Sequence, residues 1–442
     1  MERIIVKHNN ETRALSGKEV CQDILGSLEK HTDLRDHSLN LIASENRVSP
    51  VASAVLSSDI GNRYTVGPYE RWFPGLNNYT EIENHAINLL KETVFGADFV
   101  NVEPVSGMVA NMTAYHATIN RGDSVMVTSE EHGGHYSHRA GNLGVGKKAS
   151  TLLDMYGVSK VVHLPFDTER YNLDIDGCEK VIKEEKPNVI IIGTSEMLFP
   201  APIKELREIA GPDVQIIYDA SHVFGLIVGN NFQQPLVEGA NILTTSTNKT
   251  LGAACHGLVA WTNEAEAKYG YRDLVGEAMV PLFTSNHHGH HVVSLAVTMA
   301  EMKVFGKEYA EHVVSNAKAL GCALNNQGLK IVAANYGYTQ SHEILIDTQT
   351  ADSTIGMRIL EQANIMVSKC PIPNAKSDRE TGLRLGTNEM TRMGMEENDM
   401  TQIAKLIADT LFGRSNPAEV AKTVREFRNN FQTQKFCFDI KN

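Results

Sequence analysis

One lysine stands where the chain could present it for covalent chemistry. The segment Asn241 to Lys249 reads N-I-L-T-T-S-T-N-K, and Thr250-Leu251-Gly252 follows it. An apolar, threonine-rich run of this kind is typical of a buried strand, with Lys249 at its carboxyl end. Lysine is seldom buried unless its amine is used, and one use is an imine with the aldehyde of pyridoxal phosphate. A solvent-exposed lysine at a strand end is the alternative that this segment alone leaves open.

A carboxylate and a histidine stand at the end of a second strand-like run. The chain reads Tyr218-Asp219-Ala220-Ser221-His222, so Asp219 closes the run and His222 follows three residues later. An aspartate in that place could keep a pyridine nitrogen protonated, which makes the ring an electron sink. The same D-x-x-H spacing could bind a metal ion, but no further ligands accompany it at metal-binding spacing, and we expect no metal there.

Two glycine-containing segments could contact the phosphate and the ring of such a cofactor. Pro104-Val105-Ser106-Gly107 precedes a predicted helix, Met108 to Thr118, whose free N–H groups and dipole favour an anion. His132-Gly133-Gly134-His135 follows another strand-like run, and its glycines let the backbone pass close to a flat ligand. A plain helix cap at Ser106-Gly107 and an ordinary loop histidine at His135 are the alternatives.

Further polar groups suit a small, charged substrate. Gly193-Thr194-Ser195 follows a strand-like run, and Arg384 is the one charged residue of another. The guanidinium of Arg384 suits a carboxylate, although a surface ion pair would explain it equally. Ser44 could contact a polar substrate or cap a helix. The histidine cluster from Asn286 to His291 is interpreted as interface or phosphate-contacting groups, with zinc binding as the alternative.

The elements that must position these groups alternate between strands and helices. The strand-like runs are Phe99 to Glu103, Ser124 to Thr128, Val161 to Leu164, Val189 to Ile192, Val214 to Tyr218, Ile242 to Thr245 and Gly257 to Trp261. Helical stretches or turn-rich loops separate most of them. This rhythm predicts an α/β fold with a mainly parallel sheet covered on both faces, whose ligands gather beyond the carboxyl ends of the strands.

Several segments outside these strands have helical spacing. Gly17 to His31 predicts a helix in an N-terminal arm, and Thr80-Glu81-Ile82-Glu83 has the capping-box pattern of a helix start. Val292 to Phe305 and Tyr309 to Leu324 predict two further helices, the second leading into a smaller domain. We expect three parts: an arm over residues 1–55, a large domain over residues 56–305 and a small α+β domain over residues 306–442.

Composition excludes several classes of protein. The chain has 442 residues, a net charge of -12 and no run of the roughly 20 apolar residues that a membrane span needs. The polar N-terminus lacks the apolar core of a signal peptide, and the six cysteines are far apart. We therefore expect a cytoplasmic enzyme with reduced thiols. The acidic balance without basic runs argues against a nucleic-acid partner.

Taken together, these residues resemble the serine hydroxymethyltransferase family, fold-type I pyridoxal phosphate enzymes, and especially its archaeal-type members. The matching segments occur in order along the chain: Leu41 to Asn46, Asn62-Arg63-Tyr64, Ser106-Gly107 with Asn111, Gly133-Gly134-His135, Asp219 to His222, Thr247 to Thr250, and Gly382 to Thr387. The resemblance implies a seven-stranded sheet in the large domain, pyridoxal 5'-phosphate as cofactor, and chemistry on small amino acids.

The resemblance also implies a role for each matching side chain. For the cofactor, Lys249 forms the imine, Asp219 pairs with the pyridine nitrogen, His135 stacks on the ring, His222 and Ser195 touch the ring hydroxyl, Ser106 and Gly107 hold the phosphate, and Thr247 lies nearby. For the substrate, Arg384 binds the carboxylate with Ser44 close by. Tyr64 reaches a neighbouring subunit's cofactor and substrate, so the active unit is expected to be a homodimer or larger, with shared active sites.

The departures from the family pattern lie mainly on the side of the second substrate. The family's Y-A-E-G is Tyr64-Thr65-Val66-Gly67 here, and Val66 cannot transfer a proton as the usual glutamate can. The histidine before the lysine is Asn248, R-G-P-R-G-G has become Gly252 to Gly257, and the aromatic pair Trp72-Phe73 lacks a phenolic hydroxyl. The family uses that glutamate in chemistry on a folate-bound one-carbon unit.

This pattern favours an enzyme that makes or breaks the Cα–Cβ bond of β-hydroxy-α-amino acids through a glycine carbanion (quinonoid), without folate. Threonine transaldolases, a folate-independent branch of the family, are similar in kind, and the segment from Asn416 to Phe438 also looks like theirs. A serine/glycine hydroxymethyltransferase with a folate or pterin carrier is the alternative. A catalytically weak partner subunit is a lesser one, which the intact Lys249, Asp219, His135 and Arg384 argue against.

Overall fold

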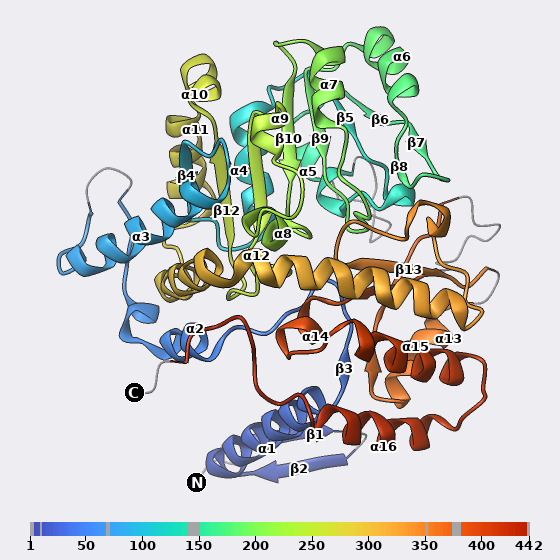
Figure 1. The fold of residues 1–442 in the computed structure, drawn as a ribbon. Helices are drawn as coiled ribbons and strands as arrows, with labels where there is room; N and C mark the ends of the chain where they lie inside the picture. Colours follow the sequence, from blue (N-terminus) through green and yellow to red (C-terminus); the bar gives the residue numbers. More distant parts are fainter. Residues whose placement is uncertain are drawn as a thin grey trace.

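The central feature of the fold is a seven-stranded sheet. The computed structural model describes residues 4–8, 11–67, 71–139, 151–349, 352–373 and 382–439, and Figure 1 shows their arrangement. The strand order is β4-β12-β11-β10-β9-β5-β6. The bounds are β4 Phe99–Asn101, β5 Ser124–Val127, β6 Lys160–His163, β9 Val189–Ile192, β10 Gln215–Asp219, β11 Ile242–Ser246 and β12 Gly257–Trp261. Every strand predicted for the large domain is confirmed to within two residues at either end.

The strands of this sheet run mainly parallel, as expected. Strands β6, β5, β9, β10 and β11 pair in parallel register, whereas β12 pairs antiparallel with both β11 and β4. The run V-I-I-I of β9 is buried throughout, because a strand in the middle of a covered parallel sheet has no face in water. The carboxyl ends of β5, β9, β10 and β11 therefore meet at one edge, where Lys249 and Asp219 were expected.

Helices cover both faces of the sheet. On one face lie α3 (Asn77–Thr93), α6 (Ile175–Glu185), α7 (Ile203–Ala210), α8 (Phe224–Val228), α9 (Pro235–Glu238) and α12 (Gly289–Asn326). On the other lie α4 (Gly107–Thr118), α5 (Leu152–Met155), α10 (Asn263–Tyr269) and α11 (Tyr271–Glu277). Alternate residues of one strand enter opposite cores: Ile190 of β9 packs with the first set, and Ile191 with the second.

Helix α12 joins the two halves of the molecule. It is one helix of 38 residues, so the prediction of separate helices at Val292 to Phe305 and Tyr309 to Leu324 is wrong. The intervening Gly306 and Lys307 carry no helix-ending signal strong enough to outweigh packing on both sides. Val292 to Val314 pack in the core of the sheet, and Ala317 to Leu324 pack in a second core. In Figure 1 the helix runs between the sheet and the C-terminal part of the chain.

The C-terminal part of the chain has its own small sheet and helices. Strands β13 (Glu343–Asp347), β16 (Gly382–Gly386) and β15 (Ser368–Cys370) form an antiparallel sheet in that order. The helices are α13 (Ser353–Gln362), α14 (Asn388–Arg392), α15 (Glu397–Leu411) and α16 (Pro417–Arg428). Strand β14 (Ile365–Met366) pairs with β3 (Leu39–Asn40), so part of the expected arm is integral to the second core. The boundaries at 55 and 305 stay predictions.

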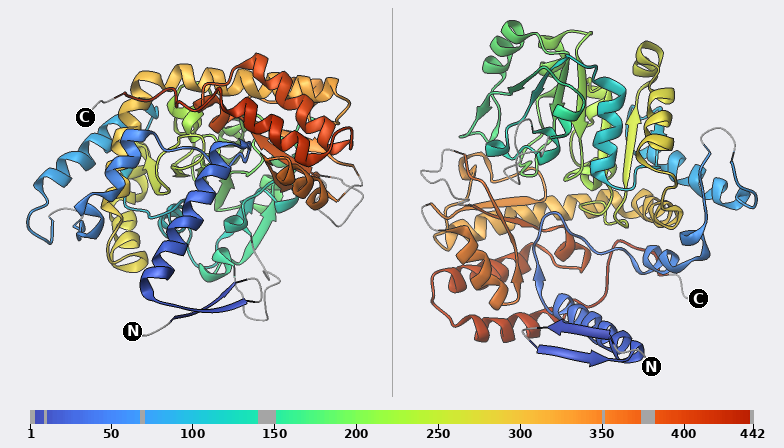
Figure 2. Two further views of the ribbon diagram at one scale, coloured as in Figure 1. Left: turned by 90° about the horizontal axis from the view of Figure 1, so that it is seen from below. Right: turned by 180° about the vertical axis from the view of Figure 1, so that it is seen from behind.

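The N-terminal segment projects from the edge of the molecule. Strands β1 (Ile4–His8) and β2 (Glu11–Leu15) form a hairpin that leads into α1 (Gly17–Asp36), and Figure 2 shows all three at the periphery. The carboxyl end of α1 contacts α16, where Arg425 pairs with Asp33 at 2.6 Å. None of the residues of α1 is buried. Among the helices that the structure describes, none is both long and apolar enough to cross a membrane.

The start of α3 differs from the expectation. The helix begins at Asn77 after Leu76, so the capping-box prediction at Thr80 to Glu83 is wrong and Thr80 lies inside the first turn. Its hydroxyl donates to the Leu76 carbonyl at 3.1 Å and accepts from Arg71 Nε at 3.0 Å. The T-x-x-E pattern predicted the wrong helix start because Asn77 and Asn78 extend the helix by one turn. A Thr side chain inside a helix can instead hydrogen-bond to a carbonyl of the preceding turn. Three short helices precede α3: α2 (Pro50–Ala54) and the 3-10 helices Val55–Ser57 and Asp59–Asn62.

The close approach of α8 and α12 gives a prediction on stability. A Cβ added at Gly229 would lie 2.4 Å from the Gly306 carbonyl oxygen and 2.6 Å from Ala310 Cβ. Gly229→Ala should therefore destabilise the fold by about 1–3 kcal/mol, as overpacking does, lowering the midpoint of urea denaturation. Gly26→Ala in α1 is the control, because a Cβ there meets nothing within 4 Å. Equal midpoints for both variants would contradict this description of the packing.

Candidate active site

A cavity of about 280 Å³ opens at the carboxyl edge of the large sheet. It brings together most of the predicted cofactor residues: Ser106, Gly107, His135, Ser195, Asp219, His222 and Lys249. They come from the ends of β4, β5, β9, β10 and β11, which is where ligands gather on a parallel sheet. A larger, open groove of about 770 Å³, lined by Tyr171, Lys330–Tyr336 and Pro373 among others, contains none of the predicted site residues.

Lys249 lies three residues beyond β11 and is held by its backbone. The Asn46 side-chain amide donates to the Lys249 carbonyl at 2.9 Å and to the Tyr309 hydroxyl at 2.9 Å. Burial lowers the pKa of the Lys249 amine, while the charge of Asp219 opposes this shift. A lowered pKa leaves more of the amine unprotonated, which is the form that attacks an aldehyde.

Asp219 ends β10 and is almost completely enclosed. It is 7% exposed, and its oxygens accept from the Asn111 amide at 2.8 Å and from the Ser221 hydroxyl at 2.5 Å. Burial alone would raise the pKa of Asp219, but its interactions with His138, His135 and Lys249, together with the Ser221 hydrogen bond, outweigh burial and lower it. Asp219 is therefore a permanent anion, able to hold a protonated pyridine nitrogen.

The loop after β5 presents His135 to the cavity. Its Nδ1 lies 2.7 Å from the Ser137 hydroxyl, and burial lowers the pKa of His135, so the ring is neutral and suited to stacking on a flat ligand. The preceding Gly134 is required by packing: a Cβ there would lie 2.1 Å from the Thr128 carbonyl oxygen. Packing against Thr128 explains the glycine at position 134 better than close approach of the backbone to a ligand does.

The opposite end of the cavity has the features of a phosphate site. Ser106 is the N-cap of α4, and its hydroxyl accepts from Val109 N–H at 3.2 Å. Gly107 sits so close to β11 that a Cβ would lie 2.9 Å from Ser246 Cβ. Within the described residues the buried Ser246 hydroxyl has no hydrogen-bond partner. A helix N-terminus beside an unpaired hydroxyl fits an anion, so the residues present fit pyridoxal phosphate at both ends.

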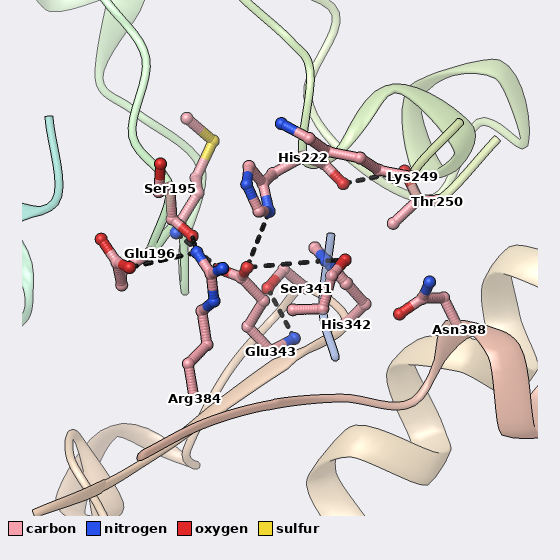
Figure 3. A network of polar contacts seen from close by, with 12 residues as sticks. Ser195, Glu196, His222, Lys249, Thr250, Ser341, His342, Glu343, Arg384 and Asn388 are labelled. Atoms are coloured by element: carbon pink, nitrogen blue, oxygen red, sulfur yellow. Dashed lines mark hydrogen bonds and ion pairs between the residues drawn. The ribbon is translucent and has the colours of Figure 1, made fainter. Parts of the chain in front are cut away.

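Arg384 lies beneath the cavity and is already partly engaged. Its Nη1 donates to the Ser195 carbonyl at 2.5 Å and to Glu196 Oε1 at 3.1 Å, and its Nε donates to Ser368 at 3.2 Å. Figure 3 shows this cluster with His222 and Lys249 above it. Nη2 makes no hydrogen bond to any residue that the structure describes. The Glu196 carboxylate therefore already partly neutralises the charge of Arg384 that a substrate carboxylate would bind.

Besides Arg384, three predicted residues do not line the cavity. Thr247 is fully buried and donates its hydroxyl to the Ala254 carbonyl at 2.6 Å, a contact that stabilises the turn after β11 rather than a ligand. The Ser44 carbonyl lies 3.5 Å from the Asn248 amide, near the lysine. Tyr64 is 53% exposed and packs against Phe73 with the two rings tilted, their centroids 5.1 Å apart. The roles of these three in binding stay predictions.

Sequence reasoning missed several polar side chains that the fold buries at the site. Glu196 and Glu343 are 6% and 0% exposed and flank Arg384. His138 lies behind Asp219, its Nε2 3.7 Å from Oδ2. Ser221 and Asn111 donate hydrogen bonds to the Asp219 carboxylate. Glu196 and Ser221 follow β9 and β10, and Asn111 lies on the helix after β4, so polar residues soon after a strand were the usable signal for them. His138 lies well beyond β5 and Glu343 begins β13, so no such signal marks these two.

The histidine cluster lies apart from the cavity. His287 is buried, with Nε2 2.7 Å from the Tyr79 hydroxyl and 3.6 Å from Glu83. The rings of His288, His290 and His291 pack on one another with centroids 4.3–6.0 Å apart. Among the described residues, the groups close enough to share one ion are instead at the cavity: His135, His138 and Asp219, and His222, His342 and Glu343. Both groups lie in or against the cavity whose residues fit pyridoxal phosphate, and we assign no metal to them.

Removal of one amine tests the assignment of the cavity. Lys249→Ala should lose the visible absorbance of bound pyridoxal phosphate after dialysis, because no other lysine lines the cavity within the described residues. Lys303→Ala, which removes an exposed lysine paired with Glu92 on the far helices, should keep the colour. A Lys249→Ala protein that remains yellow after dialysis would contradict the assignment.

Comparison with known proteins agrees with this geometry. The family model described as serine hydroxymethyltransferase matches residues 18–407. Serine hydroxymethyltransferases of Methanopyrus kandleri and Pyrobaculum calidifontis are 39% and 40% identical, over 96% and 94% of this chain and 96% and 94% of theirs. The crystal structure of L-threonine transaldolase from Pseudomonas fluorescens in its internal aldimine state superposes with a TM-score of 0.86 at 27% identity, covering 96% of this chain and 94% of that one. The protein is a pyridoxal 5'-phosphate-dependent enzyme of the serine hydroxymethyltransferase family, with the fold-type I architecture.

Proposed function

We propose that this enzyme makes and breaks the Cα–Cβ bond of β-hydroxy-α-amino acids without folate, as a threonine aldolase or transaldolase. One observation carries the proposal: the groups that serve the cofactor and glycine are all present, whereas the position that serves folate-bound carbon holds Val66. Val66 is 1% exposed, and an alkyl side chain can neither give nor accept a proton. The structural neighbour, an L-threonine transaldolase, supports the same function.

The proposed reaction needs few actions from the protein. When bound, pyridoxal phosphate withdraws electrons from the Cα of an amino acid attached to it. Asp219 holds the pyridine nitrogen protonated and so maintains that withdrawal. The Lys249 amine would hold the cofactor and, with its lowered pKa, could accept a proton in the cavity. Arg384 binds the carboxylate through its free Nη2, which orients the bond to be broken.

A second subunit is part of the proposal. The apolar side chains Ile24, Leu25 and Leu28 of α1 are more than half exposed, as are the aromatic Tyr64 and Trp72. Both sets lie on segments that project from the molecule in Figures 1 and 2. Exposed apolar patches of this kind are typical of interfaces, and a homodimer would cover them and bring Tyr64 to a partner's cavity.

A serine/glycine hydroxymethyltransferase with a folate or pterin carrier is the second candidate. The names of the archaeal relatives, at 39–40% identity over nearly the whole chain, favour it. Loss of one acid–base group costs about 10²–10⁴ in rate, so Val66 is compatible with a slow enzyme of this type.

Folate-free cleavage of threonine separates the two candidates. We expect the purified enzyme to release acetaldehyde and glycine from threonine with no added folate, at a rate that tetrahydrofolate does not change. Alcohol dehydrogenase and NADH measure the acetaldehyde, and Lys249→Ala is the blank. Serine cleavage that begins only when tetrahydrofolate is added, with no acetaldehyde from threonine, would overturn the proposal in favour of hydroxymethyl transfer.

Position 66 can be tested directly. Val66→Glu should raise folate-dependent serine cleavage by about tenfold or more, because it restores an acid–base group where the family uses one. Val66→Gln is the matched control, since it adds a polar side chain of the same size that cannot transfer a proton. Identical rates for the two variants would mean that Val66 does not explain the divergence.

A further inference from the structure

The side chain of Glu343 is a buried carboxyl group that connects the small domain to the cavity. Glu343 opens β13, and two of its contacts, Met197 and His222, come from loops of the large domain; it is 0% exposed. Figure 3 shows it between Arg384 and His222. Burying a carboxyl group without purpose is costly, and neither the cofactor assignment nor the proposed reaction uses it.

The two oxygens of Glu343 have different partners. Oε2 accepts a hydrogen bond from Met197 N–H at 2.8 Å. Oε1 lies 2.9 Å from Nδ1 of His222, although the approach is not that of a well-aligned hydrogen bond. A backbone N–H can only donate, so Oε2 must act as an acceptor. Any proton on the carboxyl group therefore sits on Oε1, facing His222.

The neighbouring histidine cannot supply that proton. His342 Nε2 lies 3.1 Å from the Ala43 carbonyl oxygen, which can only accept, and 3.6 Å from Glu343 Oε1. The Nε2–H of His342 is thus directed to Ala43. Burial lowers the pKa of His342 to about 3, so its ring stays neutral, and the exchangeable proton of the cluster belongs to Glu343 and His222.

Electrostatics places this proton on the carboxyl group at neutral pH. Burial raises the pKa of Glu343 to about 8; Arg384 and Lys249 oppose the shift, and Glu196 adds to it. Burial lowers the pKa of His222 well below its usual value, and Lys249, Arg384, His342 and His135 act in the same direction. Below pH 8, Glu343 is therefore a neutral carboxylic acid and His222 a neutral imidazole.

We propose that Glu343 is a positioning residue that fixes the tautomer of His222, its Oε1–H donating to Nδ1 so that Nε2 carries the proton on the cavity side. His222 lines the cavity, and Nε2 makes no hydrogen bond to any described residue. Nε2–H is then a fixed donor for an oxygen of the bound ring. When Glu343 ionises, its proton passes to Nδ1 and Nε2 loses its own proton to solvent. Nδ1–H then donates to the carboxylate, and Nε2 becomes an acceptor that faces the ring oxygen.

Substitution of Glu343 tests the tautomer through the bound cofactor rather than through turnover. Glu343→Gln keeps a donor toward Nδ1 and an acceptor toward Met197 but cannot ionise. Glu343→Met has similar length and no donor. We expect the visible absorbance of the wild-type holoenzyme to show an inflection near pH 8 that Glu343→Gln lacks. Glu343→Met should weaken cofactor binding by about tenfold, the cost of one hydrogen bond to the site.

Glu389→Gln is the matched control, because Glu389 is also a buried glutamate whose pKa burial raises, but its partners are Asn40, Arg35 and Arg47. It should keep the wild-type inflection. The same pH curve for wild type and Glu343→Gln, or equal loss of cofactor binding in the Gln and Met variants, would overturn the proposal. The absorbance and the affinity of the bound cofactor do not depend on which aldehyde or carrier the enzyme uses. Failure of this proposal is therefore distinguishable from failure of the proposed function.

A second measurement covers the case in which the variants fail to fold. In wild-type holoenzyme with ¹⁵N-labelled histidine, the His222 signals are those missing from His222→Gln. Nδ1 of His222 should have the chemical shift of an unprotonated nitrogen below pH 8, and Nε2 that of a protonated one. A protonated Nδ1 at neutral pH would contradict the assignment.

Discussion

A carboxylate that stays ionised inside the wall of the cavity is the constraint on which the rest of the site depends. Enclosing a charge is expensive unless hydrogen bonds and opposite charges surround it. Asp219 has both: hydrogen bonds from Asn111 on α4 and from Ser221 in its own turn, and the nearby amine of Lys249, with the imidazoles of His135 and His138 beside it. Those partners come from four segments that the parallel sheet brings to one edge. The fold therefore creates the electrostatic condition that the cofactor needs.

The small domain takes part in this site although it contributes little to the cavity wall. Arg384 of β16 and Glu343 of β13 reach the loop Ser195–Met197 of the large domain, and α12 connects the two cores as one rigid element. A movement between the domains would change the contacts of Arg384, Glu196 and His222 together. With the role proposed for Arg384, substrate binding and the contacts of His222 would depend on the same packing.

The sequence predicted what local pattern determines. The strand ends that carry Asp219, Ser195 and Lys249 follow from short β-branched runs, and the helix after Ser106 follows from its cap. It could not predict what depends on distant packing. Nothing near Glu343 in the chain indicates burial, because the cover comes from residues about 120 and 150 positions earlier. The continuous α12 was missed for the same reason, because packing against two cores outweighed the local signals.

The central claim is that Asp219 keeps the pyridine nitrogen of the bound cofactor protonated. Its most direct test is ¹⁵N NMR of the enzyme reconstituted with pyridoxal phosphate labelled at the ring nitrogen, in the wild type and in Asp219→Asn. The geometry predicts the chemical shift of a protonated nitrogen in the wild type across neutral pH and that of an unprotonated one in Asp219→Asn. An unprotonated nitrogen in the wild type would contradict it, and the role assigned to Asp219 would be wrong.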